Sequence, residues 1–403
     1  MGSKPDLIWL DGLLGSGIRP GLDRMRAILS KLKNPHRAHP SIIVAGTNGK
    51  GSTSATLASI LRHSGYRTGL YTSPHLVDIR ERWMIDGEPI GENVFADSIE
   101  VLKKASGAAV ITPTYFEALT LIAFIAFERA SCDIAVLEVG MGGRLDATNV
   151  IRPIAALITP IGIDHTEFLG NTLVKIAGEK AGVIHRGAIA LTSNHDPKIL
   201  SVIRRRAALV GSELHEVPSR ARGPIPLLGD FQRDNMALAA RAAELLIPRL
   251  PQITPESIEL GIANTRWRGR LERFLIAGKE VWVDGCHNTH AARVVAPFIA
   301  ANLPRPRLLV FGIMGDKDFG EVASHLVPHF DRVIATEPYP PRSASAASLV
   351  SVSAGLGVPA IALPAPREAL QAALASDEQA VFVGGSLYLA GAAIEFLDEQ
   401  RAR

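Results

Sequence analysis

The chain has 403 residues, more than one hydrophobic core usually fills, so its length predicts two domains. Hydrophobic residues make up 47% and charged residues 21%, proportions typical of a folded globular protein and not of a disordered one. The 43 Lys and Arg residues nearly balance the 40 Asp and Glu residues and are scattered along the chain, which argues against a nucleic-acid partner.

Cysteine content and hydropathy indicate the cellular compartment in which the protein is expected to work. Cys132 and Cys286 are too few and too far apart for a disulfide framework or a cysteine zinc site. The first residues lack the layout of a signal peptide, and the longest apolar run, 118–127, is too short to cross a bilayer. We therefore expect a cytoplasmic protein without a membrane partner, in which residues 118–127 form a buried helix.

The first half of the chain alternates short apolar strands with helices. Residues 42–45 form a β-branched run, a glycine-rich turn follows, and residues 54–63 place Leu57, Ile60 and Leu61 on one helical face. The alternation continues with predicted strands at 134–139, 155–159 and 188–192 and a predicted helix at 172–182. Strands separated by helices indicate a parallel sheet covered on both faces.

A second α/β pattern follows a predicted hinge. After a helical stretch at 235–246 come a proline-containing segment, 248–255, and an Arg- and Gly-rich segment, 266–273. Further strands are predicted at 280–284, 308–311, 332–335 and 380–383. We therefore expect an α/β protein of two domains. Residues 1–268 would form a P-loop ATPase domain with a mainly parallel sheet, and residues 272–403 a smaller Rossmann-like domain.

Residues 42–54 read IIVAGTNGKGSTS, a strand, a glycine-rich loop and a helix start. Such glycines let backbone N–H groups turn toward phosphate oxygens at a helix N-terminus. Lys50 would reach the terminal phosphates of ATP, and Ser52 would contact a magnesium ion. The strict pattern is not met, because Gly51 stands where Ser or Thr should follow the lysine; the alternative is a connecting turn. The predicted ATP-binding loop comprises Gly46, Thr47, Asn48, Gly49, Lys50, Gly51, Ser52 and Thr53.

Two further residues are expected at the same edge of the sheet. Glu138 closes one predicted strand, and His165 follows another, where ligands gather in open parallel sheets. A lone histidine is more often a hydrogen-bonded structural residue than a ligand. Together, however, the two residues predict a metal site.

Ten short motifs occur in one order along the chain, and they resemble the folylpolyglutamate synthase/dihydrofolate synthase family, a branch of the Mur ligase superfamily. Ordinary Mur ligases carry Thr or Ser directly after the loop lysine, where this branch has the extra glycine. The motifs are GTNGKGS at 46–52, TSPHL at 72–76, EVGMGGRLDATN at 138–149, DHTEFLG at 164–170, EKAGVI at 179–184, FQRDNM at 231–236, RGRLE at 268–272, DGCHN at 284–288, GDKD at 315–318 and GSLYLAG at 385–391.

The resemblance implies ATP-dependent joining of a carboxylate to the α-amino group of L-glutamate through an acyl phosphate. The acceptor would be dihydropteroate, a folate, or both. It implies two magnesium ions, one at Ser52 and a second held by Ser73, Glu138 and His165. It further implies that Lys180 is carbamylated and binds metal, and that Lys50, His165 and Lys180 are catalytic. An exposed helix lysine is the alternative for Lys180.

The resemblance also supplies nucleotide contacts outside the loop. Asn235, Arg270, Asp284 and His287 match positions that contact ATP. Their structural alternatives are a helix cap for Asn235, a surface ion pair for Arg270, and a hydrogen-bonded turn for Asp284 with His287. Cys286, within the same motif, is interpreted as a small buried residue.

Pterin recognition would separate the two activities. Thr114, Phe116, Asp146 and Ala147 match pterin-binding positions, and an aromatic plate beside a carboxylate suits a flat heterocycle rich in donors. The alternative for Phe116 is helix core. We expect dihydropteroate use, accompanied by folate extension, in a monomer. The competing interpretations are another Mur-type amide ligase and a nucleotide-binding regulator without catalysis.

Overall fold

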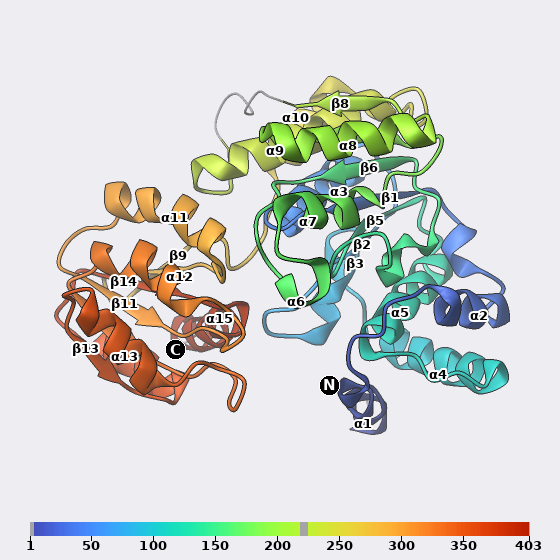
Figure 1. The fold of residues 1–403 in the computed structure, drawn as a ribbon. Coiled ribbons are helices and arrows are strands. Elements are labelled where there is room, and N and C mark those ends of the chain that lie inside the picture. Colours follow the sequence, from blue (N-terminus) through green and yellow to red (C-terminus); the bar gives the residue numbers. More distant parts are fainter. Residues whose placement is uncertain (1–3, 218–224, 403) are drawn as a thin grey trace. The chain divides into compact units, whose positions relative to one another are not determined.

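The computed structural model describes residues 4–217 and 225–402, which fold into two compact units (Figure 1). Unit 1 comprises Met1–Pro74, Arg80–Pro226 and Gln232–Arg266, and unit 2 comprises His75–Ile79, Leu227–Phe231 and Trp267–Arg403. Within the described residues, no helix has both the length and the apolar character needed to cross a bilayer.

Unit 1 is built on an eight-stranded sheet in the order β4-β3-β2-β5-β1-β6-β7-β8. All neighbours from β2 to β8 in this order are parallel, whereas β3 pairs antiparallel with β2 and with β4. The strands are β1 Ser41–Ala45, β2 Thr68–Tyr71, β3 Trp83–Ile85, β4 Glu88–Pro89, β5 Ile134–Glu138, β6 Ala155–Ile158, β7 Ile189–Thr192 and β8 Leu214–Glu216.

The helices of this part of the chain are α1 Lys4–Gly12, α2 Asp23–Lys31, α3 Lys50–His63, α4 Glu92–Ala109, α5 Tyr115–Arg129, α6 Thr166–Leu169, α7 Leu173–Ala181, α8 Pro197–Val210, α9 Asp230–Leu246 and α10 Pro255–Ala263. The predicted mainly parallel α/β fold is therefore confirmed, and the apolar run 118–127 is a buried segment of α5.

Helix α3 begins at Lys50, before the predicted start at residue 54. It packs closely on α10, where a Cβ on Gly261 would lie 2.4 Å from the Cα of Ile60. Only glycine allows that approach. The register of the central strands pairs Val44 of β1 with Glu138 of β5, so the loop after β1 and the carboxylate that ends β5 share one edge of the sheet.

Unit 2 contains a six-stranded sheet in the order β13-β12-β11-β14-β10-β9, parallel except for the β9–β10 pair. Its strands are β9 Glu272–Ile276, β10 Lys279–Val283, β11 Arg307–Phe311, β12 Arg332–Ala335, β13 Ala360–Ala362 and β14 Ala380–Gly384. Its helices are α11 Thr289–Asn302, α12 Phe319–Leu326, α13 Ala346–Gly355, α14 Pro366–Ala375 and α15 Leu387–Arg401.

Two hydrophobic clusters cover the two faces of this second sheet. Along β11, Leu309 and Phe311 pack with α11, α12 and α13, whereas Leu308 and Val310 pack with α14 and α15. This alternation is the two-residue period of a strand that is buried on both sides.

The division between the units differs from the predicted domains 1–268 and 272–403, because each unit is made of three separate segments. Leu76 packs on the cluster beside α14 and α15, and Phe231 packs on the cluster beside α11. Burial of these two apolar side chains explains why the segments His75–Ile79 and Leu227–Phe231 belong to unit 2.

Candidate active site

The glycine-rich loop connects β1 to α3 and is fixed by contacts to the segment after β6. The backbone N–H groups of Thr47 and Asn48 both donate to the carbonyl oxygen of Pro160, at 3.0 and 3.3 Å. A Cβ on Gly46 would lie 1.8 Å from Oγ1 of Thr159, so a side chain there would collide. Gly49 has a φ of 84°, a left-handed conformation that favours glycine.

Lys50, Gly51, Ser52 and Thr53 form the first turn of α3. The first N–H groups of a helix lack partners within the helix and favour an anion. The Nζ atom of Lys50 donates to the carbonyl oxygen of Thr47 at 3.1 Å and lies 4.0 Å from Oε1 of Glu138. The turn therefore combines backbone donors, a lysine and a hydroxyl, which suits phosphate and a bridging cation.

Lys180, in α7, is 4% exposed, and its Nζ atom donates to the carbonyl oxygen of Gly46 at 2.6 Å. Burial, helped by the nearby charge of Lys50, lowers the pKa of Lys180 to about 7. The alternative of an exposed helix lysine is therefore wrong. A neutral amine beside the phosphate loop is the form that reacts with carbon dioxide.

The three residues expected at the second metal site lie close to the loop and to the pocket described below. Glu138 is 4% exposed, and its Oε2 atom accepts a hydrogen bond from the backbone N–H of Ser73 at 3.3 Å. His165 precedes α6 with a φ of 50°, and it lines the pocket together with Ser73. Among the described residues, no three His, Cys, Asp or Glu side chains converge as a metal site by themselves.

Asn235 lies against the phosphate loop. A Cβ on Gly49 would be 2.2 Å from Oδ1 of Asn235, and the Nδ2 atom of Asn235 donates to Oε1 of Gln232 at 3.0 Å. Because α9 begins at Asp230, Asn235 is inside the helix, and the interpretation as its own helix cap is wrong.

Unit 2 brings the other expected nucleotide residues close to one another. The buried Asp284 follows β10 and accepts hydrogen bonds from the N–H groups of Leu271 and Cys286, at 2.9 and 2.8 Å. Burial raises the pKa of Asp284, and the charge of Arg270 opposes that shift. His287 is also close, with Nδ1 3.0 Å from the carbonyl oxygen of Gly285. The carboxylate thus has the turn-forming role that was its structural alternative.

Cys286 belongs to the same turn and is 2% exposed. Burial and the neighbouring Asp284 raise the pKa of the Cys286 thiol well above its usual value. A protonated, buried thiol is a poor nucleophile, which agrees with the interpretation of Cys286 as a small buried residue.

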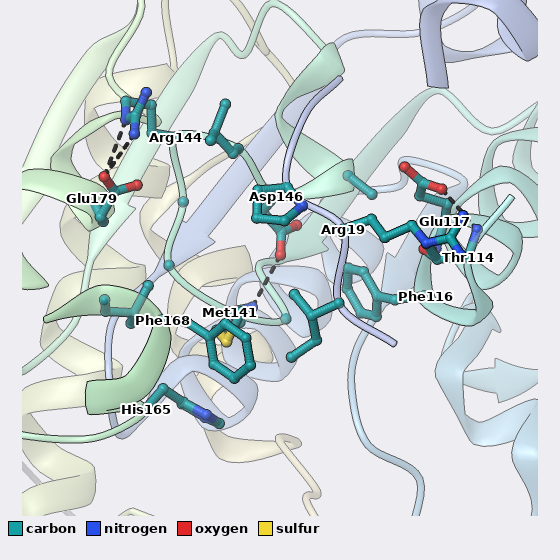
Figure 2. A pocket seen from close by; sticks show the side chains of 18 of the residues that line it. Arg19, Thr114, Phe116, Glu117, Met141, Arg144, Asp146, His165, Phe168 and Glu179 are labelled. Atoms are coloured by element: carbon teal, nitrogen blue, oxygen red, sulfur yellow. Dashed lines mark hydrogen bonds and ion pairs between the residues drawn. The ribbon is translucent and has the colours of Figure 1, made fainter. Parts of the chain in front are cut away.

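A pocket of about 400 Å³ opens in unit 1 (Figure 2). All four residues expected to bind pterin line it, as do two of the expected metal ligands. The lining residues are Gly17, Ile18, Arg19, Pro20, Gly21, Ser73, Pro74, Thr114, Phe116, Glu117, Gly140, Met141, Gly142, Gly143, Arg144, Leu145, Asp146, Ala147, His165, Phe168, Leu169 and Glu179.

Phe116 is not simple helix core, because its half-buried ring faces this pocket. The ring lies 6.2 Å from that of Tyr71, and a Cβ on Gly140 would be 2.3 Å from its Cζ atom. The carboxylate of Asp146 accepts from the backbone N–H groups of Met141 and Thr148, both at 3.0 Å. Burial raises the pKa of Asp146.

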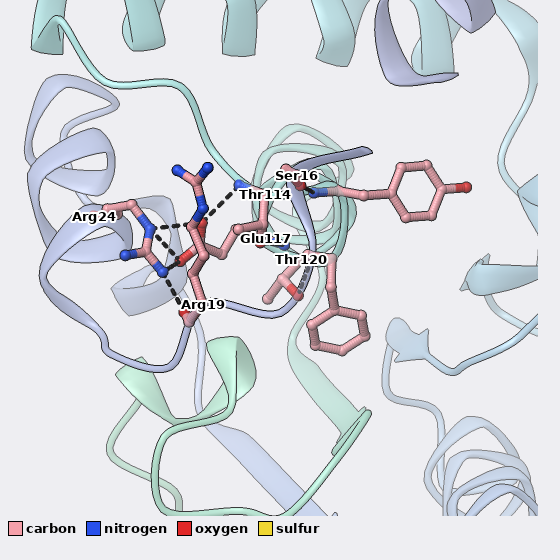
Figure 3. A network of polar contacts seen from close by, with 8 residues as sticks. Ser16, Arg19, Arg24, Thr114, Glu117 and Thr120 are labelled. Carbon is pink, nitrogen blue, oxygen red and sulfur yellow. Dashed lines mark hydrogen bonds and ion pairs between the residues drawn. The ribbon is translucent and has the colours of Figure 1, made fainter. Parts of the chain in front are cut away.

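A polar network holds one wall of the pocket (Figure 3). Thr114 and Glu117 form a capping box at the start of α5, and Arg24 pairs with Glu117 at 2.9 Å. Arg24 also donates to the carbonyl oxygen of Arg19, and Ser16 accepts from the N–H of Tyr115 at 3.2 Å. These bonds fix the loop 17–21 beside the helix that carries Phe116.

Sequence reasoning assigned no role to the loop 17–21, to Phe168, or to the ion pair of Arg144 with Glu179. The ion pair spans 2.9 Å between Nη2 and Oε1. The last three residues stand inside motifs that were recognised, but the motifs did not show that their side chains face the same pocket. The glycines at both ends of the loop were the available signal for it.

Models of two protein domains match the chain in order. The Mur ligase middle domain matches residues 44–217, and the domain described as "Mur ligase, glutamate ligase domain" matches residues 269–387. The fold and the loop at the start of α3 therefore define an ATP-dependent ligase of the Mur type, which forms amide bonds.

Individual relatives narrow the assignment from Mur-type ligases in general to one family of them. The dihydrofolate synthase/folylpolyglutamate synthase of Bacillus subtilis is 34% identical, over 79% of this chain and 81% of that protein. The solved structure of E. coli FolC in complex with DHPP and ADP is 31% identical, with a TM-score of 0.88 and 99% of both chains covered. The chain belongs to the folylpolyglutamate synthase/dihydrofolate synthase family.

One of the relatives is about twice as long as the region that it shares with this chain. A Halobacterium salinarum protein, named as a probable bifunctional folylpolyglutamate synthase/dihydropteroate synthase, is 36% identical over 92% of this chain. The chain spans 49% of that relative's length, so the similarity concerns about half of it.

Proposed function

We propose that this ligase joins L-glutamate to dihydropteroate and also extends folates, in both cases through an acyl phosphate. The observation that carries the proposal is that Phe116 and Asp146 line the same pocket as Ser73 and His165. A pterin bound by the first two residues would direct the acceptor carboxylate toward the other two.

The pterin would stack on the ring of Phe116 and donate to Asp146. Oδ2 of Asp146 accepts from the N–H of Met141, and a carboxylate oxygen can accept more than one hydrogen bond. Thr114 and Ala147, at the same pocket, would complete the pterin site. A heterocycle rich in N–H groups fits this combination of an aromatic face and a carboxylate acceptor.

We propose that Gly46 to Thr53 bind the phosphates of ATP, with Lys50 on the terminal phosphate. Asn235, Arg270, Asp284 and His287 are proposed as further nucleotide contacts, as the family resemblance implies. Support comes from the first turn of α3 and from the contact of Asn235 with the loop.

Two magnesium ions fit the oxygen donors that are present. Ser52 would hold the first ion. Ser73, Glu138 and His165 would hold the second, together with a carbamate formed from the Lys180 amine and carbon dioxide with loss of a proton. The buried carboxylate of Glu138 beside Lys50 supports this assignment, because magnesium prefers oxygen ligands. When bound, magnesium neutralises phosphoryl charge.

The reaction divides into two balanced steps. The acceptor carboxylate attacks the terminal phosphorus of ATP, which gives an acyl phosphate and ADP. The glutamate amine, having lost its proton, then attacks the acyl carbon and expels phosphate. Lys50 and the N–H groups of the first α3 turn would stabilise the phosphoryl charge, and His165 would help to orient the acceptor carboxylate.

The proposal also covers the cellular compartment and the oligomeric state of the protein. Cys132 and Cys286 are both free and buried, as in a protein of a reducing compartment, so we propose a cytoplasmic enzyme. We further propose that it acts as a monomer on small molecules.

The test is phosphate release by the purified protein with ATP, magnesium and L-glutamate, offering dihydropteroate and tetrahydrofolate separately. Release with both acceptors supports the proposal. Release with tetrahydrofolate alone would restrict the enzyme to folate extension, and release with neither would reject the folate assignment for this chain. Mass spectrometry of the products should show one added glutamyl residue.

A further inference from the structure

We propose that Phe168 is a specificity-determining residue that packs against the aminobenzoyl ring of the acceptor. The inference rests on the proposed function, because it adds a second aromatic contact to the pterin pocket. Phe168 belongs to α6, lines the pocket and is 46% exposed (Figure 2).

The acceptor carries an aromatic ring that could make such a contact. Dihydropteroate consists of a pterin, a short linker and an aminobenzoate ring that ends in the carboxylate to be activated. If the pterin lies on Phe116 and the carboxylate reaches Ser73 and His165, the benzoyl ring must occupy the pocket between them. Phe168 presents an aromatic surface in that same pocket.

The fold of the short helix α6 does not require the Phe168 ring. Its neighbour Leu169 is 8% exposed, and a Cδ2 atom of Leu169 would lie 3.0 Å from a Cβ on Gly142. Leu169 therefore fixes the turn to the glycine-rich segment after β5, while the ring of the preceding residue, Phe168, stays open to solvent. A large apolar surface left exposed inside a pocket is available for a ligand.

A backbone hydrogen bond links Phe168 to His165. The N–H groups of Phe168 and Leu169 both donate to the carbonyl oxygen of His165, at 3.0 and 2.9 Å. A ring held by Phe168 is thus placed relative to His165 by a single turn of helix. We infer that this contact fixes how far the acceptor carboxylate reaches toward the proposed metal ligand.

The experiment measures binding of two ligands to four proteins in the presence of magnesium and a non-hydrolysable ATP analogue. The ligands are dihydropteroate and a 7,8-dihydropterin fragment that lacks the aminobenzoate. The proteins are the wild type, Phe168→Ala, Phe168→Tyr and the control Leu209→Ala. Leu209 is 77% exposed on α8 and does not line the pocket.

Phe168→Ala should weaken dihydropteroate binding by about 10-fold, the effect of losing one aromatic contact. It should leave binding of the pterin fragment unchanged. Phe168→Tyr should restore dihydropteroate binding to within about 2-fold, because the ring is kept, and Leu209→Ala should match the wild type. Turnover of Phe168→Ala with dihydropteroate should also fall at saturating ATP and glutamate.

Equal dihydropteroate affinity in the wild type and in Phe168→Ala would overturn the inference. Equal weakening of both ligands would overturn it too, because the defect would then lie in the pterin site. If the wild type bound the fragment but not dihydropteroate, the benzoyl contact would also be rejected. Failure of the wild type to bind either ligand would instead reject the proposed function, and the inference with it.

Discussion

The Nζ atom of Lys180 donates to the carbonyl oxygen of Gly46 across 2.6 Å, which links α7 to the first residue of the phosphate loop. The amine is buried, and a Cβ on Gly46 would lie 1.8 Å from Oγ1 of Thr159. A chemical change at the Lys180 amine would therefore alter a hydrogen bond to the loop that would bind ATP.

Lys180→Met should abolish most turnover, with a loss of about 100-fold or more, because the side chain can neither carry a carbamate nor hold the loop carbonyl. Phosphate release with the preferred acceptor measures the loss. The apolar chain has nearly the same length, so the folded state should persist, and thermal unfolding provides the control. Wild-type protein in ¹³C-bicarbonate should show a carbamate signal that the variant lacks. A variant of full activity would contradict the role of Lys180.

Gly49→Ala should weaken binding of a non-hydrolysable ATP analogue at least about 10-fold and destabilise the protein by roughly 1 to 3 kcal/mol. The φ of 84° is strained for alanine, and the new Cβ would lie 2.2 Å from Oδ1 of Asn235. Adding Asn235→Ala removes the collision but not the backbone strain, so stability should recover only in part. Calorimetric titration and thermal unfolding of the two single variants and the double variant measure both effects. Unchanged nucleotide affinity in Gly49→Ala would contradict the proposed role of the loop in ATP binding.

Gly140→Ala should raise the KM for dihydropteroate by about 10-fold and leave the KM for ATP nearly unchanged. The added Cβ would lie 2.3 Å from Cζ of Phe116, so the ring must move from its place in the pocket. Steady-state kinetics with each substrate varied in turn separates the two effects.

Gly107→Ala is the matched control, because Gly107 lies within α4 and has no atom within 4 Å of the added Cβ. It should stabilise the protein by roughly 0.5 to 1 kcal/mol through helix propensity and leave both KM values unchanged. A rise in the KM for ATP alone in Gly140→Ala would place Phe116 outside the acceptor site.

The buried His36 should make stability depend on pH below neutrality. Burial lowers the pKa of His36 from 6.5 to about 4, and its Nδ1 atom has no hydrogen-bond partner among the described residues. The unfolded chain therefore binds this proton more tightly than the folded protein, and stability falls as the pH drops from about 6.5 to about 4.

His36→Leu removes that proton site and should be less sensitive to acid. The stability of the wild type relative to the variant should decline by roughly 2 kcal/mol between pH 6.5 and pH 4. Urea unfolding at several pH values measures this difference. Parallel pH profiles of the two proteins would show that His36 is not the group responsible.

Sequence periodicity predicted the central strands well, because β1 and β5 are short, apolar runs that are buried along their whole length. It placed the start of α3 too late, at residue 54. The glycine and serine residues that follow Lys50 have low intrinsic helix propensity, but contacts of the loop with the segment after β6, and of Thr53 with α9, hold the helix start in place.

The pocket was only partly predictable. Thr114, Phe116, Asp146 and Ala147 were expected there from the family resemblance, and all four line it. The loop 17–21 was not, because the hydrogen bond beside it joins the adjoining Ser16 to Tyr115 of α5 across 99 positions in the sequence. Neither local pattern nor propensity carries information about a contact of that range.

The contact between the segment around Leu76 and α15 affects the order in which unit 2 can fold during synthesis. Gly391 of α15 leaves room for the Leu76 backbone, since a Cβ at Gly391 would lie 2.0 Å from the Leu76 carbonyl oxygen. During synthesis, His75–Ile79 leaves the ribosome long before α15. Unit 2 can therefore be completed only after its last helix has been made and can pack against this early segment. A gene cut at the boundary near residue 267 would separate α15 from that piece. Independent expression of the two halves should then leave the C-terminal half with an unfilled groove.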